Sequence, residues 1–461
     1  MKTLNKIFHK QPRNFSLTSY LVKNFSGKHS NVIIIGAGTG GLAVGNQLAN
    51  QNIVDGKNIT IFDKSSQHFY QPGYTKLGGG IIDNIDEIKF DVKDFVKRFN
   101  FQNNGISQIN PESNSITTEE NESWTYDQLI IAAGLEVKLD SIPGLKALLD
   151  DKSKFVGTIY DPNYAQKVKR MRETFKGGRA LFTQPPPPIK CGGAPQKIAY
   201  LCDDYWKKNK IQADVHFFTP LPQMFAIKYY SDSLTKIVAE KGITPHYTSV
   251  LTSVQDGLAT FKNTSTGQTF EEKFDFLHAV PHMGAPKFLQ NSPVANASGF
   301  VTVDASMRHK KYNNIWAIGD CTDLPNAKTA AAVFSQAPVL VHNLEHSMSH
   351  SKGPVAQYDG YSSCPLFLSK DSLLLAEFRE YNDEKGNLVR ELDESFHPGA
   401  QNIPRNLYYR IAHSFTKIYP YGLKGKWYGK NAIFKPNFND ENSFNIRKYY
   451  KLLSYAPPFK L

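Results

Sequence analysis

Residues 31–41 have the sequence NVIIIGAGTGG, an apolar run followed at once by a loop of closely spaced glycines. Such an uncharged run ending in isoleucines is typical of a buried parallel strand. Residues 42–49 have the composition of a helix, and residues 59–62 (ITIF) form a second apolar run that ends at Asp63. A strand, a glycine loop, a helix and a strand followed by an acid form the pattern of a dinucleotide-binding unit. We therefore predict an α/β chain with a parallel sheet.

Each glycine of this loop has a separate task in the predicted unit. Gly36 permits the tight turn, Gly38 lets the backbone approach a pyrophosphate, and Gly41 lets the helix pack close to the sheet. The amides at the helix N-terminus favour phosphate binding. Asp63 would accept hydrogen bonds from ribose hydroxyls, and an acid at this position disfavours a ribose that carries a phosphate.

Two later segments extend this pattern. Residues 126–134 (YDQLIIAAG) and residues 314–320 (NIWAIGD) are apolar strands that end in small residues or in Gly-Asp. In this order, the three motifs resemble the signatures of flavoproteins with two dinucleotide-binding domains. The resemblance implies FAD as the cofactor, with Asp320 contacting its ribityl or phosphate part. It also implies that a helix at about residues 328–342 points its N-terminus toward the isoalloxazine.

The second nucleotide-binding loop is unusual. Residues 179–183 (RALFT) are predicted to form the first strand of a second Rossmann-like domain, where a second glycine loop would serve NADH. Four consecutive prolines, residues 185–188, stand there instead. Because proline lacks an N–H and stiffens the backbone, this loop cannot cradle a pyrophosphate in the usual way. We predict that the nicotinamide site is lost.

The chain has four cysteines, Cys191, Cys202, Cys321 and Cys364, and none is part of a CxxC pair. This spacing provides neither a disulfide framework nor a zinc or iron–sulfur ligand set, so the cysteines are redox-active, nucleophilic or simply buried. Cys202, within a predicted helix, and Cys321, after the Gly-Asp motif, are interpreted as structural. For Cys364 a buried structural role is the alternative.

Cys191 lies in the segment KCGGAPQK, just before a helix predicted over residues 196–206. A helix N-terminus and the nearby Lys190 and Lys197 would each favour the thiolate of Cys191 and lower its pKa. We therefore predict an activated thiol at this position.

The two ends of the chain are rich in basic residues, which contributes to a net charge of +12. The first thirty residues contain lysine, arginine, hydroxyl and apolar residues, and no acid precedes Asp55. This composition predicts a mitochondrial presequence, with a disordered basic tail as the alternative.

Residues 401–461 combine many aromatic and basic residues with only two acids, Asp440 and Glu441. No apolar run approaches the ~20 residues that a membrane-spanning helix needs. We favour a segment that contacts a membrane surface without spanning it. A basic lid is the alternative, and no recognised nucleic-acid-binding motif accompanies the segment.

Six segments resemble the mitochondrial, eukaryotic-type sulfide:quinone oxidoreductases, a family of two-dinucleotide-binding-domain flavoproteins. They are HFYQP (68–72), KCGGAPQK (190–197), GDCT (319–322), LP (324–325), KTAAA (328–332) and YDGYSSCPL (358–366). The similarity extends from about Asn31 to beyond Phe378, and more loosely to the C-terminus. Bacterial relatives often have a third cysteine in the first half of the chain, which is absent here.

This resemblance implies roles for individual residues. Cys191 and Cys364 would form the redox pair, with Cys191 facing the flavin and a persulfide forming on Cys364. The expected FAD-binding residues, including those of the glycine loop, are Gly36, Gly38, Thr39, Gly40, Gly41, Asp63, Gln71, Ile106, Asp320 and Lys328. Lys328 would stabilise negative charge on the reduced flavin, although a helix-surface position is the alternative. His278 and His282 match no motif and are interpreted as structural.

The implied activity is oxidation of hydrogen sulfide, with electrons passing through FAD to ubiquinone. The sulfane sulfur would go to a small acceptor, such as glutathione, sulfite or coenzyme A. The expected location is the mitochondrial inner membrane, as a peripheral or monotopic protein without a nucleic-acid partner. A type II NADH:quinone dehydrogenase and a non-enzymatic redox-sensing flavoprotein are the alternatives; the proline loop opposes the first, and the second has no use for Cys364.

These observations predict a domain organisation in sequence order. It comprises a presequence (1–30), the first part of an FAD-binding domain (31–155), a second Rossmann-like domain without a nicotinamide site (156–295), the second part of the FAD-binding domain (296–350) and a C-terminal quinone- and membrane-interacting region (351–461).

Overall fold

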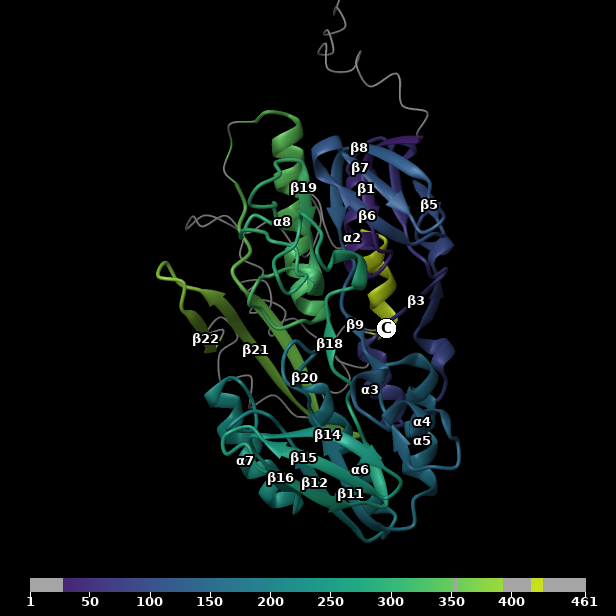
Figure 1. Cartoon of the computed structure of the whole chain (residues 1–461), viewed down its shortest axis with the longest axis vertical. Coiled ribbons are helices and arrows are strands. Elements are labelled where there is room, and N and C mark those ends of the chain that lie inside the picture. Colours follow the sequence, from purple (N-terminus) through teal and green to yellow (C-terminus); the bar gives the residue numbers. More distant parts are fainter. Residues whose placement is uncertain (1–27, 352, 354, 393–415, 426–461) are drawn as a thin grey trace, which may run out of the picture.

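The structure, a computed structural model, describes residues 28–351, 353, 355–392 and 416–425 of the 461-residue chain. Two α/β lobes lie one above the other, with the C-terminal strands running along one side (Figure 1). Most of the predicted presequence and most of the basic, aromatic C-terminal region lie outside the described residues. Within the described ranges, no helix is long and apolar enough to cross a membrane.

The upper lobe is built on a seven-stranded sheet with the order β5-β2-β1-β8-β7-β6, in which β19 also pairs with β8. Strands β5, β2, β1, β8 and β19 run parallel to one another, and β7 pairs antiparallel with both β6 and β8. The strands are β1 (Lys28–Ile35), β2 (Ile59–Phe62), β5 (Asn100–Gln102), β6 (Ile106–Asn110), β7 (Ser115–Thr118), β8 (Ser123–Ile131) and β19 (Ile315–Ala317).

The predicted strand–helix–strand unit is present in this lobe. Helix α2 (Thr39–Asn50) follows β1, and Val32 of β1 lies opposite Ile59 of β2 in a parallel register. Residues 32–35 of β1 and all of β2 are buried and, apart from Thr60, apolar, because a cluster that includes side chains of α2 and α8 (Ala330–Met348) covers one face of the sheet and a second apolar cluster covers the other. Helix α8 begins two residues later than predicted, because the side chain of Thr329 accepts a hydrogen bond from the amide of Ala332 and caps the helix.

The lower lobe contains a five-stranded parallel sheet with the order β10-β17-β11-β12-β13 and a three-stranded antiparallel sheet, β14-β15-β16. Its strands are β10 (Val156–Gly157), β11 (Gly178–Thr183), β12 (Ala213–Phe218), β13 (Thr244–His246), β14 (Ser249–Gln255), β15 (Leu258–Asn263), β16 (Thr269–Lys273) and β17 (Phe276–His278). Its helices are α4 (Leu145–Asp150), α5 (Pro162–Thr174), α6 (Ala194–Lys208) and α7 (Lys228–Lys241).

The remaining elements connect the lobes. Helix α3 (Pro72–Gly78) of the upper lobe contacts α5 and α6 of the lower lobe. A third antiparallel sheet consists of β20 (Tyr361–Ser369), β21 (Ser372–Asn382) and β22 (Leu388–Leu392), and β20 packs against both α6 and α8. Two short pairs complete the fold, β3 (Gln67–Phe69) with β4 (Lys89–Asp91) and β9 (Glu136–Val137) with β18 (Met283–Gly284).

A last helix, residues 416–423, returns to the upper lobe and is called the C-terminal helix below. It lies beside α2, where it is the yellow helix of Figure 1. Side chains of α2 bind its last carbonyls, with Asn46 Nδ2 2.9 Å from the carbonyl oxygen of Leu423. Within one fold, the chain therefore brings residues about 380 positions apart into contact.

Candidate active site

The glycine loop lies at the carboxyl end of β1 and has the shape that a pyrophosphate needs. Gly36 has a φ of +102°, and a Cβ there would lie 2.5 Å from the carbonyl oxygen of Ala132. A Cβ on Gly41 would collide with the carbonyl oxygen of Gly36. At Gly38, in contrast, a Cβ would meet nothing within 4 Å, so the backbone there faces open space. The loop is thus packed closely on one side and accessible at Gly38, and it fits a dinucleotide.

Asp63 lies at the end of β2 and is held by the same loop. One carboxylate oxygen accepts a hydrogen bond from the amide of Ala37 at 2.7 Å, and the other accepts from the amide of Ser65 at 2.8 Å. Burial raises the pKa of Asp63 above its ordinary value, while these two bonds act in the opposite direction. The carboxylate therefore occupies the position from which the dinucleotide fold binds a ribose.

The other predicted cofactor-binding residues differ in packing and exposure. A Cβ on Gly40 would lie 3.0 Å from Ile318, so this residue belongs to a tight contact between α2 and the Gly-Asp strand. Gln71 is exposed just before α3. The Ile106 side chain is buried in the apolar cluster that includes Ile33. A contact with FAD at position 106 would therefore come from the backbone.

Asp320, Lys190 and Lys328 form a charged group next to the cysteine loop. Burial raises the pKa of Asp320, while the charges of Lys190 and Lys328 lower it. Lys328 Nζ donates to the carbonyl oxygens of Thr322 at 2.9 Å and Leu324 at 3.0 Å. An ammonium has three donors, and these bonds use two of them. The backbone of Lys328 pairs with that of Lys190, which places this group next to Cys191.

The two distant cysteines lie together. The Sγ atoms of Cys191 and Cys364 are 3.4 Å apart, and both residues carry free thiols. Cys191 lies in the loop before α6 with a φ of +48°, a left-handed conformation that is costly for a side chain other than glycine. Its amide donates to the carbonyl oxygen of Lys328 at 2.7 Å, which helps to hold this conformation.

Gly193 makes the approach of the two sulfurs possible. A Cβ at this position would lie 2.5 Å from Cys364 Sγ and 2.7 Å from Leu366. Both of these residues belong to β20, which packs against α6. Gly193, two residues after Cys191, therefore allows β20 to bring the second sulfur against the cysteine loop.

The electrostatic surroundings of the two thiols are unequal. The hydrogen bond from Cys364 and the charge of Lys197 lower the pKa of Cys191 to about 5, although burial acts in the opposite direction. Lys197 Nζ lies 3.4 Å from Cys191 Sγ, and this lysine is buried. For Cys364, the hydrogen bond that it makes with Cys191 and its burial raise the pKa well above the ordinary value. At neutral pH the pair therefore holds one thiolate, on Cys191, and one thiol.

Of the two lysines expected to lower the pKa of Cys191, only Lys197 does so. Lys197 supplies the positive charge at the thiol, whereas Lys190 is paired electrostatically with Asp320. The other two cysteines match the structural interpretation, because burial raises the pKa of Cys202 to about 12 and that of Cys321 to about 11. Such buried thiols are inert at neutral pH.

Sequence reasoning missed several residues around the pair. Tyr160 donates a hydrogen bond to the carbonyl oxygen of Cys191 at 3.3 Å. Lys76 and Tyr419 are buried at the contact between α3, the glycine loop and the C-terminal helix. None of the three lies in a recognised motif, and only the packing of distant elements brings them to the site.

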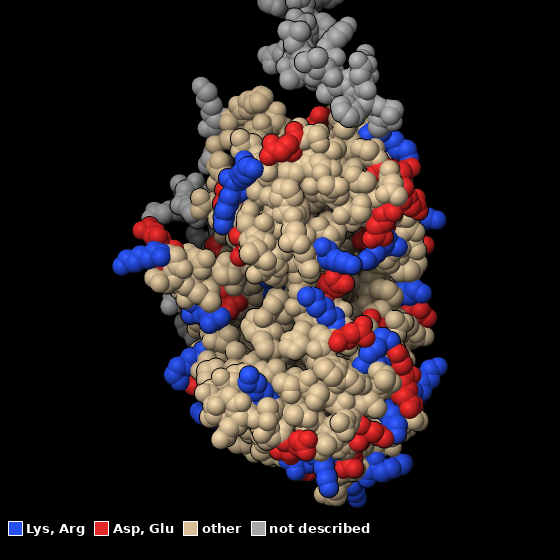
Figure 2. Space-filling model, in the orientation of Figure 1, with Lys and Arg blue, Asp and Glu red and all other residues tan. Residues whose placement is uncertain are grey.

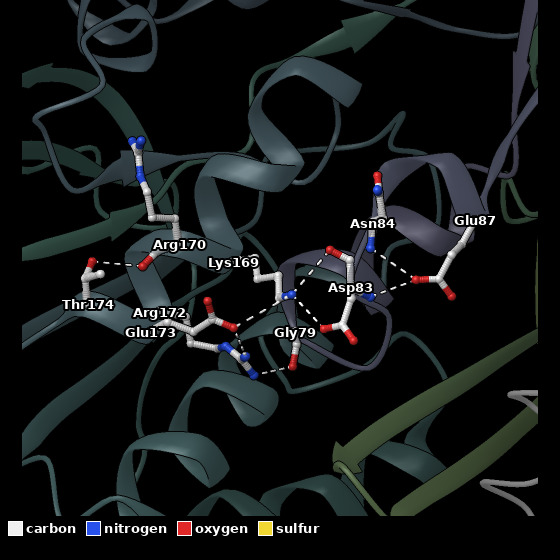
Figure 3. Close-up of polar contacts among 9 residues, drawn as sticks. All are labelled: Gly79, Asp83, Asn84, Glu87, Lys169, Arg170, Arg172, Glu173 and Thr174. Carbon is white, nitrogen blue, oxygen red and sulfur yellow. Dashed lines mark hydrogen bonds and ion pairs between the residues drawn. The ribbon is translucent and has the colours of Figure 1, made fainter.

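A polar clamp fixes α3 of the upper lobe against α5 of the lower lobe (Figure 3). The buried guanidinium of Arg172 donates to the carbonyl oxygen of Gly79 and lies over the ring of Tyr205, 4.3 Å from its centroid. Lys169 Nζ lies 2.7 Å from Asp83 Oδ1. The clamp holds α3, which follows the predicted flavin-contacting Gln71, against the lobe that carries Cys191.

The fold and this site define a flavoprotein oxidoreductase of the disulfide-reductase type, with a thiol pair next to the dinucleotide-binding unit. Residues 30–175 match the family model described as pyridine nucleotide-disulphide oxidoreductase. The motifs and the family match point to FAD as the cofactor.

Curated relatives narrow the class to a family. The chain is 35% identical to the mitochondrial sulfide:quinone oxidoreductase of Schizosaccharomyces pombe, over 95% of this chain and 99% of the relative. It is 37% identical to the protein of the same name from Dictyostelium discoideum, over 88% and 89% of the two chains. The chain belongs to the mitochondrial sulfide:quinone oxidoreductase family.

A solved structure supports the fold. The sulfide:quinone oxidoreductase of Aquifex aeolicus superimposes with a TM-score of 0.69 at 18% sequence identity, covering 87% of this chain and 92% of that one. At this identity the similarity establishes the two-lobed architecture, and the site has to be argued from the residues of this chain.

Proposed function

We propose that this protein oxidises hydrogen sulfide through Cys191 and Cys364 and transfers the electrons to a quinone. The observation that carries the proposal is the 3.4 Å separation of the two sulfurs, with a buried lysine beside them. Two thiols so placed need little movement to form a disulfide bridge. The family to which the chain belongs takes its name from this reaction.

In the first step, hydrosulfide attacks the Cys364 sulfur of the oxidised bridge. A new S–S bond forms between sulfide and Cys364, the Cys191–Cys364 bond breaks, and its electron pair leaves on the Cys191 thiolate. Cys191 suits the role of leaving group because its pKa is about 5, and a thiol of low pKa leaves faster. The ammonium of Lys197 stabilises the thiolate that forms.

In the second step, a small nucleophile attacks the outer sulfur of the Cys364 persulfide and removes it. A thiol such as glutathione or coenzyme A, or sulfite, has the required chemistry. Closure of the bridge between Cys191 and Cys364 then releases two electrons. Bound FAD would supply the acceptor for this electron pair and would link the cysteine pair to ubiquinone.

The surroundings of Cys191 support its role as the cysteine nearer to the flavin. Its amide bonds to Lys328, and its charge acts on Asp320 of the Gly-Asp motif. Burial lowers the pKa of Lys328, while the charge of Asp320 in this motif acts to raise it. In its ammonium form, Lys328 would stabilise an anionic reduced cofactor. The predicted cofactor contacts of the glycine loop, Asp63, Gln71 and Ile106 complete this part of the proposal.

A membrane surface is the proposed source of the quinone. The C-terminal helix exposes Lys417, Ile418 and Tyr421, and Lys424 is exposed just after it. This mixture of basic, aromatic and aliphatic side chains suits a membrane interface. The relatives are named as mitochondrial proteins. Within the mitochondrion, we place this protein at the surface of the inner membrane. In contrast, lysine and arginine alternate with acidic residues among the described residues on the face shown in Figure 2, which does not resemble a nucleic-acid-binding surface.

An anaerobic titration tests the proposal. The purified flavoprotein is titrated with sulfide and, separately, with NADH, and the flavin absorbance is followed. We expect sulfide to bleach the flavin and NADH to leave it oxidised, since four prolines replace the second glycine loop. Bleaching by NADH alone would return the chain to the NADH:quinone dehydrogenases.

A further inference from the structure

The hydroxyl of Tyr419 links the C-terminal helix to the glycine loop. It lies 2.7 Å from Thr39 Oγ1 and 2.6 Å from His68 Nε2. His68 Nδ1 lies 3.2 Å from the carbonyl oxygen of Ala37. A chain of hydrogen bonds therefore runs from Ala37 through His68 and Tyr419 to Thr39, and its two ends lie on either side of Gly38.

The direction of each bond follows from the chemistry of the groups. The Ala37 carbonyl only accepts, so His68 carries its proton on Nδ1. Burial lowers the pKa of His68 to about 4, which keeps the ring neutral at pH 7 and makes Nε2 an acceptor. Tyr419 must then donate to His68, and Thr39 must donate to the oxygen of Tyr419. With these directions, each hydrogen bond from Ala37 through His68 and Tyr419 to Thr39 joins one donor to one acceptor.

The ring of Tyr419 is held as firmly as its hydroxyl. Tyr419 is 1% exposed, and its ring stacks on His68 with centroids 5.8 Å apart and planes inclined by 16°. The rings of Tyr70, before α3, and Phe334, in α8, lie 4.4 Å and 6.0 Å away. The residue is thus wedged between the elements that surround the glycine loop.

Helix α2 holds the C-terminal helix along its length. Asn46 binds the carbonyl oxygen of Leu423, and Asn50 Nδ2 lies 2.7 Å from the carbonyl oxygen of Lys424. These amides satisfy carbonyls that the end of a helix leaves without a partner. From Thr39 to Asn50, the helix that follows the glycine loop is therefore in contact with the C-terminal segment.

We propose that Tyr419 is a positioning residue for FAD. By holding Ala37 and Thr39 on both sides of Gly38, it shapes the loop for a pyrophosphate before the cofactor arrives. Docking of the C-terminal helix and binding of FAD then favour each other, because a coupling between two sites is reciprocal. This inference rests on the FAD-binding part of the proposed function and extends the cofactor site to the far end of the chain.

The test measures FAD binding and needs no sulfide. Tyr419→Phe in the full chain keeps the ring but leaves His68 and Thr39 without their partner. We expect the FAD dissociation constant, measured by flavin fluorescence on titrating the apoprotein, to rise about tenfold. Tyr421→Phe, on the same helix but 53% exposed, is the matched control and should bind FAD like the wild type.

A double-mutant cycle separates a specific bond from general damage. Thr39→Val removes the donor at the other end, so adding it to Tyr419→Phe should weaken FAD binding by clearly less than the sum of the single effects. Hydrogen exchange of the amides in residues 416–423 of the wild type should slow when FAD is added. Unchanged FAD affinity in Tyr419→Phe, or exchange that FAD leaves unaltered, would overturn the coupling. A wild-type chain that binds no FAD would overturn the proposed function as well.

Discussion

Lys197 places its ammonium 3.4 Å from the sulfur of Cys191, and both cysteine sulfurs raise the pKa of this lysine although burial acts to lower it. One buried cation therefore serves both members of the thiol pair. Negative charge alternates between the two sulfurs in the proposed reaction, on Cys191 after sulfide attack and on Cys364 after sulfur transfer. A cation that contacts both can stabilise each state without moving far.

The first prediction concerns this cation. Replacing Lys197 with Met should raise the pKa of Cys191 by roughly one to three pH units, because an opposite charge within a few ångströms stabilises the ionised form by that amount. The pH dependence of iodoacetamide alkylation of the reduced protein reports this pKa. Lys208→Met, at the exposed end of the same helix, is the control and should leave the alkylation profile in place. An identical profile for Lys197→Met would contradict the assigned role.

The second prediction concerns the cysteine pair. Cys364→Ser removes the sulfur that sulfide is proposed to attack, so sulfide should no longer reduce the flavin faster than it reduces free FAD. Stopped-flow absorbance under anaerobic conditions measures this rate. Cys202→Ala removes a buried thiol of raised pKa in α6 and should retain sulfide-driven reduction. Full activity in Cys364→Ser would favour a redox-sensing or non-enzymatic flavoprotein.

The third prediction concerns the close approach at Gly193. Gly193→Ala should destabilise the protein by about 1–3 kcal/mol, because the new methyl group would overlap Cys364 and Leu366. Urea unfolding measures the loss, and slower sulfide-driven reduction should accompany it. Gly192→Ala is the matched control, since its Cβ would meet no atom closer than 3.7 Å. Equal stability of the two variants would show that β20 is not held against the loop in this way.

The fourth prediction concerns the clamp between the lobes. Arg172→Met should lower the free energy of unfolding by roughly 2 kcal/mol, because the carbonyl of Gly79 loses a charged hydrogen-bond donor inside the protein. Arg170 lies at an exposed position of the same helix, and its side chain points away from Arg172 in Figure 3. Arg170→Met removes only an exposed hydrogen bond to the carbonyl oxygen of Lys152 and should change the free energy of unfolding by less than about 0.5 kcal/mol. Urea unfolding at pH 7 distinguishes the two, and equal losses would mean that the buried guanidinium is not the clamp.

The fifth prediction concerns pH. Lys76 is 2% exposed, donates to Thr416 Oγ1 at 2.5 Å, and burial together with the charge of Lys197 lowers its pKa to about 7. Between pH 7 and the ordinary lysine pKa near 10.5, the unfolded chain binds a proton here that the folded chain does not. The free energy of unfolding therefore rises with pH in this window, by up to about 1.4 kcal/mol per pH unit from this residue.

A comparison of wild type with Lys76→Met isolates this contribution. Urea unfolding at pH 6.5, 8 and 9.5 should show the wild type gaining stability relative to the variant as the pH rises. Lys64→Met, at an exposed position, should follow the wild type throughout. A stability difference that is constant across these pH values would contradict the lowered pKa of Lys76.

Local sequence alone predicted the parallel strands around the glycine loop and the loop itself, but not β5, β6 and β7 of the same sheet. Residues 31–41 and Asp63 are near each other in sequence, so the strand, the glycine turn and the acid of the next strand form a pattern that a short segment shows by itself. The predicted strands over residues 59–62 and 179–183 are present for the same reason, since apolar runs of this length suit strands buried on both faces.

The assembly of the site needed the tertiary structure. Chemistry and family resemblance could nominate Cys191 and Cys364, but their 3.4 Å separation depends on β20 packing against α6 and on the missing side chain of Gly193. From the sequence, either Lys190 or Lys197 was a candidate for the charge that stabilises the Cys191 thiolate. The packing of α6 places Lys197 at the sulfur, whereas Lys190 interacts with Asp320.

Tyr419 is the clearest example of a site residue that only the tertiary structure reveals. Its place beside Thr39, 380 positions earlier, leaves no pattern in the sequence, because a single hydroxyl donates and accepts wherever the fold carries it. The sequence by itself determined the dinucleotide fold from periodicity and local motifs, and its resemblance to the family nominated Cys191 and Cys364 as the candidate redox pair. The tertiary structure decided which charges and hydroxyls surround them, because burial and distance set the pKa of a thiol and the shape of a loop.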